Sequence, residues 1–248
     1  MMEKRLFLIN QSAAFFVDPS KDFNTEFGIL HSSDLKKAKI GSQVKTHKGI
    51  KFFVIEPTAS DLIKKIIRLP QIITLKDLGS IIAYSGIKSY SKILEAGTGS
   101  GFSTCVLASV ARNGRVISYE IRKDFAKVAK KNIELFGLDN VKIINADIKD
   151  GIKEKAFDFV LLDMPDPWKV VGLVAKVMKI GARICTYSPS IIQIEKTIKE
   201  LPDTLKVERL MTVIENDWKV ELNRDILRPQ SDGLTHTAFM LFSRKVMI

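Results

Sequence analysis

The chain has 248 residues, 46% of them hydrophobic and 27% charged, which is the composition of a globular protein with a sizeable core. No apolar run approaches the roughly 20 residues of a membrane-spanning helix, and residues 1–10 lack the long apolar stretch and cleavage site of a secretory signal peptide. We therefore expect a cytoplasmic protein with no membrane contact. Its two cysteines and three histidines are scattered along the chain, which argues against a metal site and a Ser-His-Asp triad.

Lysine and arginine outnumber aspartate and glutamate by 39 to 28, so the formal net charge is +11. Residues 1–75 contribute 12 basic and 7 acidic side chains, which makes this part disproportionately basic. Positive charge of this size favours association with a polyanion. A lysine-rich solvated surface is the alternative interpretation, and composition alone does not separate the two.

The first part of the chain is predicted to form a small β domain over residues 1–57. Short apolar runs rich in β-formers are separated by polar, glycine-containing turns, at residues 6–9, 14–17 and 51–55. At Thr58 the pattern becomes helical, because residues 58–61 have the form of a capping box and apolar residues follow at helical spacing up to Ile67. A second helix start at Thr74 leads us to assign residues 58–90 to bridging helices.

Residues 91–248 alternate between apolar strand candidates and amphipathic helix candidates. Strands are expected at 93–96, 116–119, 141–145, 157–162, 182–187, 207–214 and 237–242, and helices at 102–111, 123–136, 168–178 and 191–200. Such alternation predicts an α/β fold with a Rossmann-like sheet of seven strands, largely parallel, and helices on both faces. Ligands of such sheets bind beyond the carboxyl ends of the strands, where the strand order reverses.

A glycine-rich loop follows the first of these strands and opens a helix. It contains Gly97, Thr98, Gly99, Ser100 and Gly101. Without Cβ atoms, the glycines let the backbone turn tightly against a ligand. A dinucleotide fingerprint needs a further glycine at position 102, which is phenylalanine here. The spacing fits better a loop that wraps the amino-acid end of S-adenosylmethionine, and we predict that all five residues bind this cofactor.

Acidic residues follow the next two strands. Glu120 comes about twenty residues after the loop, where a carboxylate can accept both hydroxyls of a cofactor ribose. Asp147 is placed to receive the adenine amino group, and Ile121 and Phe125 to pack on the faces of the ring. Each acid alone is compatible with an ordinary surface residue. Three features at the ends of three consecutive strands, however, indicate an S-adenosylmethionine-dependent methyltransferase.

The fourth strand ends in Asp163-Met164-Pro165-Asp166-Pro167-Trp168, beside the predicted position of the transferable methyl group. An acid followed by prolines and an aromatic residue at this place resembles methyltransferases that act on nitrogen atoms of nucleobases, in which the acid accepts a hydrogen bond from an exocyclic amine. A strand-end turn with Pro167 at the first position of a helix explains the prolines but leaves Asp163 unexplained.

Nearly the full length of the chain resembles the TrmI-type tRNA (adenine-N1)-methyltransferases. The resemblance is carried by Lys45-Thr46-His47-Lys48-Gly49, Pro57-Thr58, Lys76-Asp77, Leu94–Gly101, Ser118-Tyr119-Glu120, Leu162-Asp163, Pro167-Trp168-Lys169, Tyr187-Ser188-Pro189, Gln193 and Gly233–Phe239. It implies methylation of the T-loop adenine at nucleotide 58 of tRNA, in archaea also nucleotide 57, by a homotetramer. Two departures are visible: Leu75 stands where a proline often precedes the Lys-Asp pair, and two residues separate Gly233 from His236.

The resemblance also implies roles for individual residues. By similarity, Thr98–Gly101, Glu120, Asp147 and Asp163 bind the cofactor, Asp163 also serves catalysis, and Tyr187, His236 and Thr237 line the adenine pocket. We expect Asp163 to stabilise positive charge that grows on the adenine, and Tyr187 or Trp168 to support the flipped base. Core packing of Tyr187 and a purely structural His236 remain alternatives. Lys45 and Lys48 are predicted to contact tRNA phosphates.

Two other functions are weighed against this one. A protein carboxyl methyltransferase of the isoaspartyl type has a similar glycine loop, but its reaction segment does not resemble residues 163–168. A non-catalytic tRNA-binding subunit would have lost its cofactor site, whereas the glycine loop, Glu120, Asp147 and Asp163 are all present here. The predicted function is therefore S-adenosylmethionine-dependent methylation of tRNA without a metal ion.

Overall fold

The computed structural model of the chain describes residues 5–69, 71–221, 224–230 and 236–247. It divides into two compact units, which we call the N-terminal unit (Met1–Ile66 with Glu134–Gly137) and the C-terminal unit (Ile67–Ile133 with Leu138–Ile248). The division falls inside the predicted bridging segment, residues 58–90. Within the described ranges, no helix has the length and apolarity that crossing a membrane requires.

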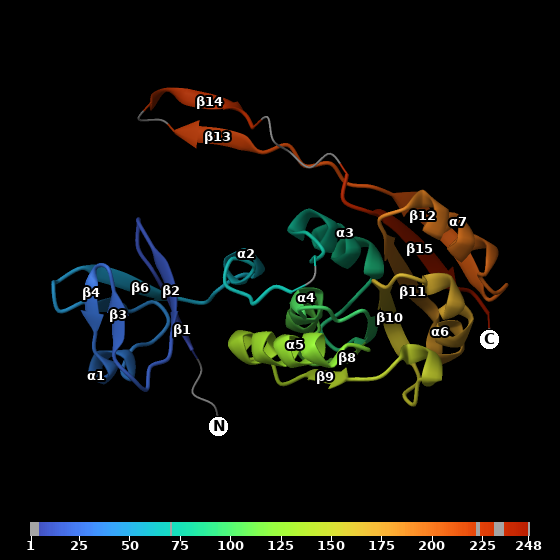
Figure 1. Cartoon of the computed structure of the whole chain (residues 1–248), viewed down its shortest axis with the longest axis horizontal. Helices are drawn as coiled ribbons and strands as arrows, with labels where there is room; N and C mark the ends of the chain where they lie inside the picture. The colour runs from blue at the N-terminus through green and yellow to red at the C-terminus, as the bar shows by residue number, and fades with distance from the viewer. Residues whose placement is uncertain (1–4, 70, 222–223, 231–235, 248) are drawn as a thin grey trace. The chain divides into compact units, whose positions relative to one another are not determined.

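The N-terminal unit contains a four-stranded antiparallel sheet in the order β2-β1-β6-β5 (Figure 1). Its elements are β1 (Leu6–Ile9), β2 (Ala14–Val17), the hairpin of β3 (Phe23–Thr25) and β4 (Gly28–Leu30), helix α1 (Ser32–Leu35), β5 (Gln43–Lys45) and β6 (Lys51–Ile55). The three predicted strands are confirmed. Because side chains alternate across a strand, β6 buries Phe52 and Val54 in the core and exposes Phe53.

The C-terminal unit is built on a seven-stranded sheet in the order β12-β15-β11-β10-β7-β8-β9 (Figure 1). The strands from β11 to β9 in this order run parallel, and β15 is antiparallel to β11 and β12. Their bounds are β7 (Lys92–Ala96), β8 (Arg115–Tyr119), β9 (Val141–Ile144), β10 (Phe157–Leu162), β11 (Met178–Ser188), β12 (Leu205–Met211) and β15 (Phe239–Lys245). The order reverses between β7 and β10, so ligands are expected beyond the ends of these two strands. The predicted Rossmann-like α/β fold is confirmed.

Helices cover both faces of this sheet. Leu94 of β7 belongs to a buried cluster that includes Val171 and Val174 of α6 (Val171–Val177). The next residue, Glu95, points to the opposite face and accepts a hydrogen bond from Ser103 of α4 (Phe102–Val110). Other helical elements are α3 (Leu75–Ser85), α5 (Lys123–Phe136), α7 (Ile191–Lys199) and the 3-10 turns η1 (Ile148–Asp150) and η2 (Pro167–Lys169). The apolar core therefore lies on both sides of the parallel strands, as is usual for buried parallel sheets.

The helix predicted after Thr58 is much shorter than its apolar pattern suggests. Helix α2 spans only Ala59–Leu62. The predicted capping box is present, because Asp61 accepts a hydrogen bond from the backbone N–H of Thr58 at 2.9 Å. The backbone of Ile67, however, bonds to the side chain of Asn132, through its N–H at 3.0 Å and its carbonyl at 2.9 Å. These distant bonds hold the backbone of Ile67 in place of helical ones, five residues beyond the end of α2.

The last third of the chain also differs from the prediction in its details. A hairpin of β13 (Trp218–Glu221) and β14 (Ile226–Pro229), which was not predicted, separates β12 from β15 in the sequence. Strands β12 and β15 have other bounds than the predicted 207–214 and 237–242. The predicted helix 168–178 is divided into η2 and α6 and ends at Val177, because Met178 already pairs with Phe157 as the first residue of β11.

Candidate active site

The glycine loop passes closely beside the end of β10. Gly97 has a φ of +93°, and a Cβ atom there would lie 1.7 Å from the carbonyl oxygen of Asp163. Gly101 has a φ of +78°, and its Cβ atom would lie 2.9 Å from that of Ala129 in α5. A left-handed φ and close backbone approach both favour glycine. The two glycines therefore let the loop lie directly against Asp163 on one side and against α5 on the other.

Glu120 follows β8, and backbone amides hold its carboxylate from two sides. Oε2 accepts a hydrogen bond from the N–H of Gly99 at 2.8 Å, and Oε1 accepts one from the N–H of Arg122 at 2.9 Å. The residue is only 6% exposed. Since each carboxylate oxygen has a second lone pair, Glu120 offers fixed acceptors to a ligand beside the loop.

A cavity of about 500 Å³ lies at these strand ends in the C-terminal unit. Its wall includes the predicted cofactor residues Gly97, Gly99, Glu120, Ile121, Phe125, Asp147 and Asp163. The wall also includes residues to which the sequence alone assigned no role, among them Gln71, Tyr119, Arg122, Ile148, Lys149 and Met164. One cavity thus brings together the loop and acids from neighbouring strand ends, at the position where sheets of this kind bind ligands.

The other predicted loop residues lie outside the wall of this cavity. Thr98 and Ser100 are each 2% exposed. The Thr98 hydroxyl oxygen is 2.5 Å from that of Ser118, and the Ser100 hydroxyl accepts a hydrogen bond from the N–H of Leu69 at 3.1 Å. These side chains shape the loop from within, and Gly101 does so through its close approach to α5. Contact of Thr98, Ser100 and Gly101 with the cofactor stays a prediction.

A second acid, Glu95, lies beneath the loop on β7 and is completely buried. It accepts hydrogen bonds from the hydroxyls of Ser103 at 2.6 Å and Ser118 at 2.7 Å, and from that of Thr104. Burial raises the pKa of Glu95 above its usual value. Glu95 was not among the predicted site residues, although an acid inside an apolar strand directly before a glycine loop indicates a special role.

The predicted adenine contacts line the cavity beyond Glu120. Asp147 caps η1, because its Oδ1 accepts a hydrogen bond from the N–H of Lys149 at 2.9 Å. Ile121 is 66% exposed. The guanidinium carbon of Arg122 lies 3.7 Å from the centroid of the Phe125 ring and covers one of its faces. Ile121 and Phe125 therefore supply apolar surface to the cavity wall, with Arg122 stacked on one face of the Phe125 ring.

Asp163 directly follows β10 and forms part of the cavity wall. Its backbone N–H donates to the carbonyl of Ala96 at 2.9 Å, which fixes it beside the glycine loop. Burial, together with the negative charges of Glu95 and Glu120, raises the pKa of Asp163 to about 7. Strongly shifted carboxyl groups in cavities are candidates for catalytic residues. A cation bound nearby would favour the ionised form.

Polar contacts fasten the turn that follows. Asp166 accepts from the ammonium group of Lys149 at 2.8 Å, and the carbonyl of Pro165 accepts from the side-chain amide of Gln193 at 2.9 Å. The ammonium group of a lysine of α7 lies 5.2 Å from the ring centroid of Trp168. Residues 163–168 are therefore held against α7 and η1, and their conformation does not depend on the prolines alone.

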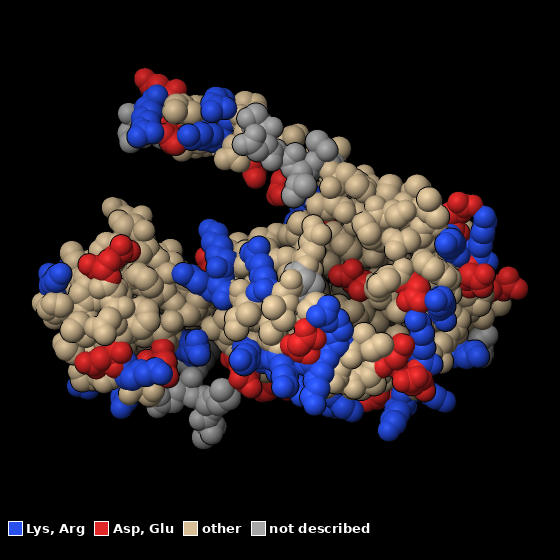
Figure 2. Space-filling view, viewed as in Figure 1, with Lys and Arg blue, Asp and Glu red and all other residues tan. Residues whose placement is uncertain are grey.

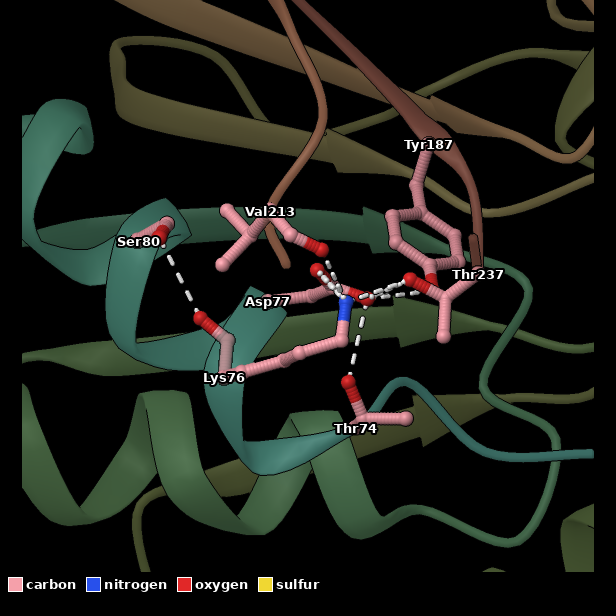
Figure 3. A network of polar contacts seen from close by, with 7 residues as sticks. All are labelled: Thr74, Lys76, Asp77, Ser80, Tyr187, Val213 and Thr237. Atoms are coloured by element: carbon pink, nitrogen blue, oxygen red, sulfur yellow. Dashed lines mark hydrogen bonds and ion pairs between the residues drawn. The ribbon is translucent and has the colours of Figure 1, made fainter. Parts of the chain in front are cut away.

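Tyr187 and Thr237, both predicted to line the adenine pocket, meet in one hydrogen-bond network (Figure 3). Both donate to Oδ2 of Asp77, from the Tyr187 phenol at 2.9 Å and from the Thr237 hydroxyl at 2.6 Å. The residues before Tyr187 and Asp163 pair with each other in β11 and β10, so these two residues follow at adjacent strand ends. The structure therefore brings Tyr187 next to Asp163 along the sheet edge.

The remaining predicted substrate residues are on the surface. His236 is exposed, and the centroid of its ring lies 4.7 Å from that of Phe239. Residues 233–235, which belong to the resemblance noted above, lie outside the described residues. Lys45 in β5 and Lys48 in the following turn are exposed on the N-terminal unit. These placements leave the roles of His236, Lys45 and Lys48 as predictions.

Comparison with known proteins gives a consistent result. The family model described as tRNA methyltransferase complex GCD14 subunit matches residues 52–224. The chain is 35% identical over 251 residues to the tRNA (adenine(57)-N(1)/adenine(58)-N(1))-methyltransferase TrmI of Methanocaldococcus jannaschii, covering 90% of this chain and 87% of that relative. It is 29% identical over 238 residues to the tRNA (adenine(58)-N(1))-methyltransferase TrmI of Thermus thermophilus, covering 94% and 92%.

Solved structures are similar over the same length. An S-adenosylmethionine-dependent O-methyltransferase of Thermotoga maritima aligns with a TM-score of 0.79 and 31% identity, covering 100% of this chain and 95% of that one. The tRNA (m1A58) methyltransferase TrmI of Aquifex aeolicus aligns with a TM-score of 0.75 and 26% identity, covering 98% and 97%. With a glycine loop, Glu120 and Asp163 gathered at the switch point of its sheet, the chain belongs to the TrmI-type family of tRNA (adenine-N1)-methyltransferases.

Proposed function

We propose that the chain transfers a methyl group from S-adenosylmethionine to N1 of an adenine in the T loop of tRNA. The position is nucleotide 58, with nucleotide 57 as a second acceptor, as in the name of the Methanocaldococcus jannaschii relative. The observation that carries this proposal is the position of Asp163, a carboxyl with a pKa raised to about 7 in the wall of the cavity shared by Glu120 and the glycine loop.

The residues of the cavity fit S-adenosylmethionine. Gly97 lets the loop lie directly against the carbonyl of Asp163, which a Cβ atom would overlap, so the loop and Asp163 face the same cavity at close range. The Glu120 carboxylate is already oriented by two backbone amides and can accept from two ribose hydroxyls. Asp147 and the apolar surfaces of Ile121 and Phe125 line the same cavity and suit an adenine ring. Asp163 would then lie toward the cationic end of the cofactor.

The chemistry follows from these positions. The bound cofactor supplies a methyl group on a sulfonium centre that is open to in-line displacement. The chain has to hold adenine N1 on that axis, which is mostly a matter of positioning. Alkylation leaves positive charge on the ring, so an Asp163 carboxylate that accepts from the N6 amine stabilises charge growing in the transition state. The adenine has to leave the T-loop stack, and Tyr187, near the end of β11 and next to Asp163 along the sheet, offers an aromatic surface to it.

Exposed lysines supply the charge for a polyanionic substrate. Lys and Arg side chains gather over α5 in Figure 2, and Lys127, Lys130 and Lys131 of this helix are exposed. Helix α5 begins just after Glu120, and its first turn contributes Phe125 to the cavity wall. The exposed lysines therefore lie on a helix that starts at the cavity. Lys45 and Lys48 are exposed on the N-terminal unit. Contacts of such lysines with tRNA phosphates would release counterions and make binding dependent on salt.

Mapping of the methylated product tests this function. Purified protein is incubated with unmodified tRNA and methyl-labelled S-adenosylmethionine, and the nucleosides and oligonucleotide fragments are analysed by mass spectrometry. We expect the label in 1-methyladenosine within the T loop. Label in another nucleoside, or in an isoaspartyl peptide offered in parallel, would contradict the proposal. Cofactor binding without methylation of tRNA would point instead to a non-catalytic subunit.

We further propose that the protein acts as a homotetramer in the cytoplasm. The proposal rests on the family to which the chain belongs. Light scattering of the purified protein gives its mass directly. A mass of four chains is expected, and a monomer at micromolar concentration would contradict the assembly but not the chemistry.

A further inference from the structure

We infer that Lys76 and Asp77 form a positioning pair that holds Tyr187 and Thr237 for the incoming adenine, an inference that rests on the proposed function. Neither residue is part of the wall of the cavity that contains Asp163. Both lie at the first turn of α3, far in sequence from the residues they hold. The pair is shown with its partners in Figure 3.

Asp77 is completely buried and gathers hydrogen bonds from four side chains. Its Oδ1 accepts from Lys76 at 2.9 Å. Its Oδ2 accepts from Tyr187 at 2.9 Å, Thr237 at 2.6 Å and Thr74 at 3.0 Å. Although burial alone raises it, these hydrogen bonds lower the pKa of Asp77 below its usual value. Asp77 is therefore a carboxylate whose oxygens are fully engaged with the pocket side chains.

Lys76 completes the arrangement from the other side. Its ammonium group is bound to Oδ1 of Asp77 at 2.9 Å, to the Thr237 hydroxyl at 2.7 Å and to the carbonyl of Val213 at 2.8 Å. An ammonium group has three hydrogens to donate, so all of them are used. Its side chain is 6% exposed, which leaves it unsuited to contacting a tRNA phosphate. Val213 follows β12 and Thr237 precedes β15, so Lys76 also joins the two chain segments that lead out of β12 and into β15.

In this arrangement the ring of Tyr187, and not its hydroxyl, is available to the adenine. The phenol donates to Asp77, and burial together with the charge of Asp77 raises the pKa of Tyr187 above its usual value. The hydroxyl therefore keeps its proton at neutral pH and acts as a tether. With the hydroxyl fixed, the ring is held in one orientation at the sheet edge next to Asp163. The same carboxylate fixes Thr237, so a single group sets both predicted pocket residues.

A buried ion pair is by itself weak evidence for stability, because the cost of desolvation offsets the attraction of the charges. A geometric role predicts that replacing the pair affects catalysis more than folding. We therefore compare Asp77→Asn, Tyr187→Phe and the double variant in single-turnover methylation of tRNA with saturating cofactor. Each single variant should be slower by about 10-fold to 100-fold, the effect of a small misplacement of reacting groups. The double variant should be no slower than either single one.

Cofactor affinity, measured by calorimetry, should stay within twofold of wild type in all three variants. If Asp77→Asn does not fold, Lys76→Met combined with Asp77→Asn removes both charges and takes its place. Lys245→Met is the matched control, because Lys245 is 7% exposed and donates to the carbonyls of Ala175 and Met178 away from the cavity. It should lower the melting temperature without slowing methylation by the folded protein.

Three results would overturn the positioning role. The first is a double variant whose loss in methylation rate is the product of the two single losses, and the second is a loss of cofactor affinity as large as the loss of rate. The third is a rate that falls only in proportion to the fraction of folded protein, as in the control. The proposed function is tested separately by the wild-type reaction. If the wild-type protein does not methylate tRNA, the proposed function is wrong. The coupling between Asp77 and Tyr187 is then measured from the denaturant midpoints of unfolding of the single and double variants. Shifts that are additive there would show that Asp77 and Tyr187 do not act together.

Discussion

The Glu120 carboxylate is tied to the glycine loop through the backbone N–H of Gly99, which donates to its Oε2 at 2.8 Å. The bond joins the ends of β7 and β8 and orients an acid that also faces the cavity. Replacing Glu120 therefore changes both the loop and the predicted ribose contact.

We predict that Glu120→Ala weakens binding of S-adenosylmethionine by about 1.5 to 3 kcal/mol, the usual value of a hydrogen bond to a charged group. This corresponds to a dissociation constant about 10-fold to 150-fold higher in calorimetry. Asp139→Ala is the control, because Asp139 is an exposed acid of the same unit outside the cavity wall. Unchanged affinity of Glu120→Ala would show that the ribose assignment is wrong.

Gly97→Ala should abolish cofactor binding and destabilise the protein. The new methyl group would overlap the carbonyl oxygen of Asp163, which is 1.7 Å away, so either the loop or the end of β10 has to move. Gly41→Ala separates this overlap from backbone strain, because Gly41 has a similar φ of +88° and open space around it. Thermal unfolding of Gly41→Ala should show only the loss from strain, about 1 to 3 kcal/mol. An equal loss in both variants would contradict the close approach at Gly97.

Asp163 should make stability depend on pH. Its pKa is raised from 3.8 to about 7, so the folded protein holds this proton more tightly than the unfolded chain. The stabilisation by the proton is fully present below the unfolded value and is lost as pH rises through about 7. Asp163→Asn should therefore melt at a higher temperature than wild type at pH 8, and the difference should shrink at pH 5. A difference that does not change with pH would contradict the shifted pKa of Asp163.

Binding of tRNA should weaken steeply with salt, since the slope of log affinity against log salt counts the phosphates that are neutralised. Replacing Lys45 and Lys48 by Glu should lower the affinity for every tRNA species and reduce this slope, without changing cofactor affinity. Lys36 and Lys37 are exposed lysines of the same unit, and their replacement by Glu is the matched control for net charge. If replacing Lys36 and Lys37 lowers tRNA affinity as much as replacing Lys45 and Lys48, then Lys45 and Lys48 are ordinary residues of a solvated surface.

Short-range sequence patterns predicted strands of both units and the glycine loop, because these depend on neighbouring residues. The strands of the N-terminal unit follow from short β-forming runs, and β6 shows the alternation directly through buried Phe52 beside exposed Phe53. The loop and Glu120 were found because their spacing reflects a strand, a turn and a helix of fixed length. Glu95 was within reach of the same argument, since an acid inside an apolar strand has to be explained.

Long-range contacts explain what could not be predicted. Ile67 belongs to the predicted helical pattern, but its backbone is bound instead by Asn132 from 65 residues away, which no window of the sequence reveals. Asp77 meets Tyr187 and Thr237 across 110 and 160 residues. The hairpin of β13 and β14 was missed because its strands are short and carry charged residues in place of a long apolar run. The contacts of Asn132 and Asp77 depend on topology, whereas the hairpin has too weak a local pattern to be recognised.

The most direct test of the account is the single-turnover rate at which Asp163→Asn forms 1-methyladenosine in the T loop of tRNA, measured beside wild type at saturating S-adenosylmethionine. Asn keeps the size and one acceptor oxygen of Asp but has no charge. If Asp163 stabilises the charge that develops on adenine, its contribution belongs to the transition state, and the variant should be about 10²-fold to 10⁴-fold slower. A rate close to that of wild type would contradict electrostatic catalysis by Asp163.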